Sequence, residues 1–284
     1  MVTPAFSIVL ILLILPLIFS FYLSFRNYDI LKGTKDFVGF SNYYKILQDN
    51  SFFRAIIRNL IYVGGVIGLN FLIGLGMALI VHQIDNKFIR KTITTIIVLP
   101  MMLIPSSAAV FWRVIYNKEF GILNQFINFF GFERIAWLAS DKLALYAVMF
   151  TDIWSWTPWM FLVLFAGLQN ISREAIEAAQ IDGASFWQVL RYITLPLLKP
   201  IIFIAMMLKS IDTFRTFDYV WIMTNGGPGE SSQIISTFIY RTAFRFFKYG
   251  YASSIAIVQF LIASLLSILF LVFLTKKEKQ ESRR

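Results

Sequence analysis

The sequence lacks cysteine altogether and contains one histidine among its 284 residues. Without cysteine, the chain can form no disulfide, no thiol nucleophile and no thiolate metal site. The single histidine, His82, ends an apolar block and has no companion ligands, so an interfacial role is preferred to a metal site. Charged residues are also scarce, at 15% of the chain. The lack of cysteine and the single histidine argue against thiol and metal chemistry. The low content of charged residues argues against a soluble protein with a single hydrophobic core.

Motifs that carry catalysis are missing as well. The chain has no G-x-x-x-x-G-K-S/T phosphate-binding loop, so it is not expected to hydrolyse ATP itself. It also has neither the H-E-x-x-H zinc motif nor the G-x-S-x-G nucleophile elbow. We therefore expect a protein that is not an enzyme, with no catalytic residues and no metal or cofactor of its own.

Apolar residues make up 58% of the chain, and its mean hydropathy is +0.68. Such apolarity over this length predicts a protein dissolved in a bilayer. The net charge of +10 could indicate binding to nucleic acid, but the basic residues do not form a continuous stripe. They lie between apolar blocks and in the tail that contains Lys276, Lys277 and Lys279, as expected for segments beside anionic lipid. Membrane lipid is therefore the expected partner, and nucleic acid is not.

Six blocks are long enough to cross a membrane as helices, at about 20 residues each. We predict an all-α, polytopic membrane protein with a single transmembrane domain over residues 1–284. The first block has neither a basic residue before it nor a small-residue cleavage site, so it is interpreted as a retained span. The predicted spans cover approximately residues 3–25, 57–82, 93–116, 142–168, 200–223 and 250–274.

The distribution of basic residues favours a cytoplasmic location for both termini. The loops on the two sides carry nearly equal numbers of Lys and Arg, but on the proposed inner side these residues are concentrated in short segments. Lys87, Arg90 and Lys91 share one short turn, whereas the outer basic residues are diluted by aspartates. The positive-inside rule then places the polar segment after the fourth span, residues 171–199, in the cytoplasm.

This polar segment is predicted to form two short helices. Ser172 can cap the first, and Gly183 suits the left-handed position that ends it. Ser185 and Gln188 have the spacing of a capping box for the second. Pro196 is expected to end that helix before the fifth span. The first helix would present a small, smooth face for docking, although an ordinary amphipathic loop would have the same residues.

The same segment resembles the EAA loop of the permeases of bacterial ABC importers. The residues that carry the resemblance are Glu177, Ala178, Ala179, Asp182, Gly183 and Ala184, followed by Ile193, Leu195 and Pro196. The resemblance implies a type I importer permease fold, in which this loop is the coupling helix that sits in a cleft of an ATP-binding subunit. ATP and Mg would then be bound by a dimer of that partner subunit.

Other stretches resemble the carbohydrate branch of the same family, the permeases for maltose-type sugars and glycerol phosphate. These stretches are Phe37 to Tyr43, Trp154 to Pro158, Phe217 to Asp218 with Thr224 to Pro228, and Gly250 to Ser253. The resemblance implies import of a sugar or related polyol across the bacterial inner membrane. It also implies an extracytoplasmic binding protein and a second permease subunit, usually a different chain.

Ionisable residues within the apolar blocks indicate a possible substrate path. Lys209, Asp212, Arg215 and Tyr219 follow one helical face of the fifth block. Such groups are expensive in lipid, so they should face an aqueous path or one another. A second group lies in the fourth block and combines a carboxylate with rings that could stack on sugars; it comprises Asp152, Trp154 and Trp156. Structural ion pairs, Lys209–Asp212 or Asp212–Arg215, are the alternative.

Two other functions remain open from the sequence. One is a secondary transporter driven by an ion gradient, although we find no convincing internal repeat of the kind common in that class. The other is an ABC permease for a solute that is not a sugar. The sequence does not determine which sugar or polyol would be carried.

Overall fold

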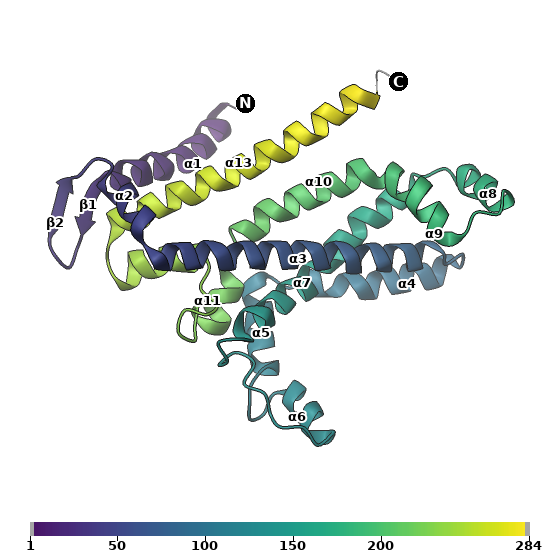
Figure 1. Cartoon of the computed structure of the whole chain (residues 1–284), viewed down its shortest axis with the longest axis horizontal. Helices are drawn as coiled ribbons and strands as arrows, with labels where there is room; N and C mark the ends of the chain where they lie inside the picture. Colours follow the sequence, from purple (N-terminus) through teal and green to yellow (C-terminus); the bar gives the residue numbers. More distant parts are fainter. Residues whose placement is uncertain (1–2, 282–284) are drawn as a thin grey trace. The chain divides into compact units, whose positions relative to one another are not determined.

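The computed structural model describes residues 3–281, and most of them are helical (Figure 1). The described residues fall into two compact units. One comprises the residues up to Asn59 together with Gln233–Leu266, and the other comprises Leu60–Ser232 together with the residues from Ser267 onward. Helices α3 (Asn50–His82) and α13 (Tyr249–Glu281) each contribute to both units.

Within the described residues, four helical stretches are long and apolar enough to cross a membrane. They are α3, α7 (Ala144–Gln169), the stretch Phe186–Phe214, and the Tyr249–Leu269 part of α13. Helix α1 (Thr3–Ser24) contains a shorter apolar helix, Val9–Ser24. The polytopic helical class is therefore as predicted, while the count of six spans stays a prediction.

The third apolar block is bent instead of forming one straight span. Helix α4 (Lys87–Val98) continues into a 3-10 turn, Leu99–Met102, and then meets α5 (Pro105–Ile115) at 94°. Proline disfavours the helical region for the residue before it. Ile104 accordingly adopts φ −64° and ψ 147°, and Pro105 begins the new helix. If the pair forms one broken span, the number of candidate spans rises to five.

The fifth block is also displaced from its predicted bounds of 200–223. Helix α9 (Phe186–Val189) passes through a π-helical turn, Leu190–Thr194, into α10 (Leu195–Phe214). The wider π turn comes immediately before Pro196 in the first turn of α10, so Pro196 does not end the helix. At its other end α10 stops at Phe214, and α11 (Asp218–Thr224) is a separate helix.

The core of the second unit contains a close approach between α3 and α7. A Cβ atom added to Gly74 would lie 2.9 Å from Met160 Cγ and 3.1 Å from the backbone nitrogen of Phe161. Met160 and Phe161 are fully buried, so neither can easily move aside. Gly68, on the same helix, has open space where its Cβ would be.

Replacing Gly74 with alanine is expected to destabilise the protein by about 1–3 kcal/mol, because the added methyl group overpacks the α3–α7 contact. Gly68→Ala is the matched control. It should be neutral or stabilise by up to about 1 kcal/mol, since glycine is a poor helix former. Thermal unfolding of the two purified variants tests this difference. Equal melting temperatures would contradict the close-packing argument.

In the first unit, β1 (Arg26–Asp29) pairs antiparallel with β2 (Thr34–Phe37), a short hairpin that the sequence did not predict. Its turn contains Gly33 at φ +65°. Helix α2 (Ser41–Gln48) follows, and the buried amide of Asn42 donates to the carbonyls of Ser24 and Arg26, both at 2.9 Å. Helix α12 (Ile235–Tyr240) and a π turn, Arg241–Arg245, lead into α13.

Candidate coupling turn and intramembrane polar cluster

The turn between α8 (Arg173–Ile181) and α9 is set by local hydrogen bonds. Gly183 has φ +80°, the left-handed conformation predicted for it. Its N–H donates to the Gln180 carbonyl at 3.0 Å, and the Ala184 N–H donates to the Ala179 carbonyl at 2.9 Å. This pair of bonds is the Schellman motif, which ends α8 and fixes the direction of the chain into α9.

The two predicted helix starts are found at Ser172 and Ser185. At α9, the Gln188 side chain accepts a hydrogen bond from the Ser185 N–H at 2.7 Å, as the capping-box spacing predicts. At α8, Ser172 occupies the N-cap position, but its side chain makes no capping hydrogen bond. Of the two helices, α9 is therefore the one whose first turn is stabilised by a side-chain hydrogen bond.

The outer face of the turn combines small, acidic and bulky apolar side chains. Glu177, Ala178, Asp182 and Gly183 are exposed, and Ala179 and Ala184 are half-buried. Ile181 is 86% exposed and Trp187 is 73% exposed. On α9, Val189 is buried, whereas Trp187 points out.

A cavity of about 240 Å³ lies behind the turn, between it and the ends of α3 and α7. Its lining includes Leu79 and His82 from α3, Leu168 from α7, and Gln180 and Phe186 from the turn. His82 contacts the ring of Phe165 edge-on, with centroids 6.5 Å apart.

A buried ion pair connects α7 with α10. Lys209 Nζ lies 2.9 Å from Asp152 Oδ1, and both side chains are at most 3% exposed. The Tyr62 hydroxyl of α3 donates to the other carboxylate oxygen, Asp152 Oδ2, at 3.0 Å. The lysine ammonium also lies over the Trp156 ring, 4.7 Å from its centroid, in cation–π geometry. Three helices thus meet at one carboxylate.

The structure separates the residues that the sequence grouped together. Trp156, Trp159, Lys209 and Asp212 line a cavity of about 200 Å³. Trp154 instead lies against α5, with its ring stacked on Phe111 at 6.3 Å and edge-on to Trp112 at 5.5 Å.

The remaining predicted residues lie beyond the end of α10. Arg215 is exposed and pairs with Asp212 at 3.4 Å, whereas the predicted alternative, a Lys209–Asp212 pair, is replaced by Lys209–Asp152. Tyr219, in α11, is buried. Burial raises the pKa of its phenol above the ordinary value of 10, and the nearby Asp152 carboxylate raises it further, so Tyr219 stays neutral.

Two polar residues on α3 were missed from the sequence. Besides Tyr62, Asn70 is fully buried and accepts a hydrogen bond from the Thr157 hydroxyl at 2.7 Å. An asparagine in the middle of an apolar helix is a signal that could have been used, because polar groups in lipid seek partners. A tyrosine in such a helix carries no comparable signal.

Comparison with known proteins identifies the family. Residues 70–279 match the family described as the binding-protein-dependent transport system inner membrane component. This match covers most of the chain and includes both the α8–α9 turn and the Asp152–Lys209 pair. The chain belongs to this family of ABC transporter permeases. The permease is accordingly a non-catalytic, multi-pass subunit of the inner membrane.

The permease is similar over most of its length to other permeases. It is 34% identical to the probable ABC transporter permease protein y4oQ of Sinorhizobium fredii, over 89% of this chain and 82% of that one. It is 32% identical to the trehalose/maltose transport system permease protein MalF of Thermococcus litoralis, over 95% of this chain and 91% of that one. It is 31% identical to the sulfoquinovosyl glycerol transport system permease protein SmoG of Agrobacterium fabrum, over 98% of this chain and 90% of that one.

The fold of the permease also occurs in a solved structure. A chain of a bacterial ABC transporter involved in the import of the acidic polysaccharide alginate superimposes with a TM-score of 0.85. The alignment covers 96% of the permease and 93% of that chain, at 23% identity. At this identity the likeness establishes the fold alone.

Proposed function

We propose that the permease forms the translocation path of an ATP-driven importer for a sugar, a di- or oligosaccharide or a related polyol. The observation that carries the substrate class is the full-length similarity to permeases named for trehalose/maltose and sulfoquinovosyl glycerol. An ion-gradient-driven transporter is not supported by the family match. A permease for a non-sugar solute remains the second candidate.

The α8–α9 turn would couple ATP hydrolysis by a partner subunit to transport. In this proposal the turn docks into an ATP-binding subunit, one of a dimer that binds ATP and Mg. The exposed carboxylates of Glu177 and Asp182 supply polar contacts, while Ile181 and Trp187 supply apolar anchors of the kind that dominate interfaces. Closure of the ATP-binding dimer would then move the turn and shift the permease between inward- and outward-open states.

The cargo would pass along the cavity at Trp156 and Asp212. A sugar offers hydroxyl groups to a carboxylate and an apolar ring face to an indole, and Trp156, Trp159 and Asp212 present both kinds of group around one space. Lys209 also lines this cavity, and its buried pair with Asp152 would fix the ammonium against Trp156. Trp154, Arg215 and Tyr219 would shape the neighbouring parts of the path.

The complete transporter in this proposal has further subunits. An extracytoplasmic solute-binding protein delivers the substrate, as in the alginate transporter crystallised with its substrate-bound periplasmic protein. A second permease, a different chain, completes the path. Both termini of the permease lie in the cytoplasm, on the side of the ATP-binding subunits.

Uptake into proteoliposomes that contain the complete transporter tests the energy source. Transport should stop when ATP is depleted while the ion gradients are clamped, and the permease should copurify with an ATP-binding subunit. Transport that continues without ATP would contradict the proposal.

A binding screen of the extracytoplasmic protein against sugars, polyols and amino acids tests the substrate class. Selective binding of a sugar or polyol is expected. Selective binding of another solute would leave the importer proposal intact and reject only its carbohydrate part.

A further inference from the structure

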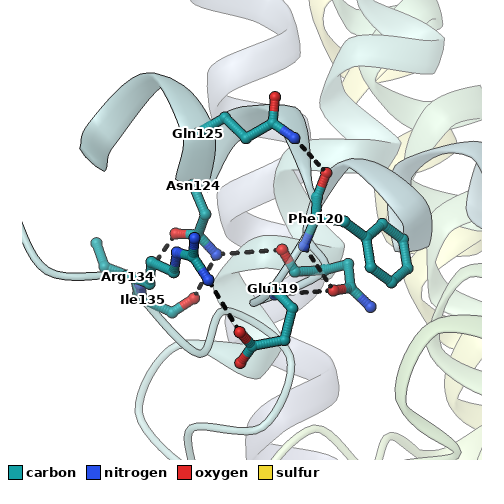
Figure 2. Close-up of polar contacts among 7 residues, drawn as sticks. Glu119, Phe120, Asn124, Gln125, Arg134 and Ile135 are labelled. Carbon is teal, nitrogen blue, oxygen red and sulfur yellow. Dashed lines mark hydrogen bonds and ion pairs between the residues drawn. The ribbon is translucent and has the colours of Figure 1, made fainter. Parts of the chain in front are cut away.

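The connection between α5 and α7 folds around a buried asparagine. It contains α6 (Ile122–Phe129), and Asn124 of this helix is fully buried. The Asn124 amide donates to the carbonyls of Asn117 (3.3 Å) and Ile135 (2.9 Å), and its oxygen accepts from the Ile135 N–H at 2.9 Å (Figure 2). One side chain therefore ties the segments on both sides of α6 to this helix.

Three more contacts close the same framework. Gln125 Nε2 donates to the Phe120 carbonyl at 3.0 Å, and the Asn117 side chain accepts from the Phe120 N–H at 3.2 Å. Arg134 pairs with Glu119 at 2.9 Å (Figure 2). The connection thus satisfies these polar groups internally and holds α6 in a defined orientation without help from another chain.

Helix α6 exposes an apolar stripe, although Leu123 and Ile127 on its other side are half-buried. Ile122, Phe126 and Phe129 lie at i, i+4 and i+7, on one stripe of α6, and all three are exposed, whereas Asn124 faces inward. A helix that faced only water would turn its apolar stripe inward. The exposed apolar side chains of the connection are Phe120, Ile122, Phe126, Phe129, Phe130 and Phe132, at 60% to 84% exposure.

The helices that flank the connection also expose aromatic side chains near it. Phe111 of α5 and Tyr146 and Phe150 of α7 are each more than half exposed, close to the ends that meet the connection. Helix α7 runs from this connection to α8, so α6 lies at the opposite end of the span from the α8–α9 turn (Figure 1). Because α7 is a candidate span, the connection at its first residue is expected close to the surface of the hydrocarbon, the depth at which aromatic side chains concentrate.

We propose that the α6 stripe is an interfacial anchor, inserted among the lipids of the leaflet opposite the α8–α9 turn. Residues 117–143 carry three basic and three acidic side chains, so charge gives no preference for anionic lipid. Apolar burial is the source of the binding, and zwitterionic lipid is sufficient for it. The inference depends on the membrane location of the permease and not on its substrate or its coupling to ATP.

Site-directed spin labelling tests the anchor: this chain has no native cysteine, so each variant of it carries one label when it is labelled before assembly with the other subunits. The variants Phe126→Cys, Phe129→Cys and the control Asn128→Cys are labelled and then assembled into the complete transporter, in phosphatidylcholine vesicles. Asn128 is exposed on the same helix but lies off the stripe. Labels at Phe126 and Phe129 should collide often with oxygen and several-fold less often with a water-soluble nickel complex than the label at Asn128.

Each alternative occupant of the stripe gives a different result. Frequent collisions with nickel at all three positions would place the stripe in water. Few collisions with either reagent at Phe126 and Phe129 would place it against another subunit of the transporter. Protection from nickel that requires added binding protein, or that requires anionic lipid in the vesicles, would also overturn the proposal. Uptake by each labelled variant verifies that the transporter is folded.

Discussion

Gly183→Pro is expected to abolish substrate uptake while leaving the permease inserted in the membrane. Proline fixes φ near −65°, whereas Gly183 has φ +80°, and proline has no N–H to donate to the Gln180 carbonyl. The Schellman end of α8 would be lost, and with it the angle at which the turn meets an ATP-binding subunit. Uptake and ATP hydrolysis measured together should show lost transport, with hydrolysis no longer stimulated by substrate.

Gly33→Pro is the matched control for this variant. Gly33 also has a positive φ, +65°, and also donates its N–H in a turn, to the Ile30 carbonyl at 3.2 Å. It lies in the β1–β2 hairpin, far along the chain from the α8–α9 turn. Gly33→Pro should retain uptake. If the two variants failed equally, loss of folding would explain Gly183→Pro, and wild-type uptake by a well-expressed Gly183→Pro permease would rule out the coupling role.

Reversing one charge on the same turn tests docking without altering the backbone. Glu177 is exposed, so Glu177→Lys should not disturb folding. It is expected to weaken binding of the ATP-binding subunit and to reduce uptake strongly, because a contact with a partner surface becomes repulsive. Copurification of the subunits measures the effect, and unchanged copurification and uptake would remove Glu177 from the interface.

Asp152→Asn should cause the largest loss of stability among the intramembrane substitutions, about 3–5 kcal/mol, because it leaves the buried Lys209 ammonium without its counter-ion. Asparagine keeps an acceptor for the Tyr62 hydroxyl, so the lost charge is the main change. The double variant Asp152→Asn, Lys209→Met removes both charges and should recover most of the stability. Thermal unfolding in detergent or nanodiscs measures both.

Asp212→Asn separates a structural carboxylate from a path-lining one. Asp212 is 46% exposed and its pair with Arg215 is exposed, so its loss should change stability by less than about 1 kcal/mol. Because Asp212 lines the cavity beside Trp156, the variant should instead change the apparent affinity of uptake. If uptake affinity is unaltered in both Asp152→Asn and Asp212→Asn, the proposed path along this face is wrong.

Structural features that depend on residues close together in the sequence could be predicted. The left-handed Gly183 and the Ser185–Gln188 capping box follow from a few adjacent side chains, and the structure has both. The helical membrane class follows from hydropathy in the same way. The bend between α4 and α5 was not predicted, although Pro105 was visible. Whether a proline kinks a helix or breaks it depends on packing around the break, which the sequence does not specify.

The partner of Lys209 could not be read from the sequence for a similar reason. Helical periodicity offered Asp212 on the same helix, but the ammonium reaches across to Asp152 on α7. The rotation of α7 against α10 decides this choice, and that rotation results from many apolar contacts around Met160, Phe161 and Leu198. The inward position of Asn124 on α6 could not be predicted either, because only the folded chain brings Asn117 and Ile135 close to its side chain.

The π turn between α9 and α10 has a mechanical consequence. Because the π turn keeps the chain helical from Phe186 to Phe214, no loop separates α9 from Lys209, about 35 Å along the same helical stretch. In the proposed coupling, a movement of α9 would therefore pass along this helix to Lys209, which is paired with Asp152 of α7, itself bonded by Tyr62 of α3.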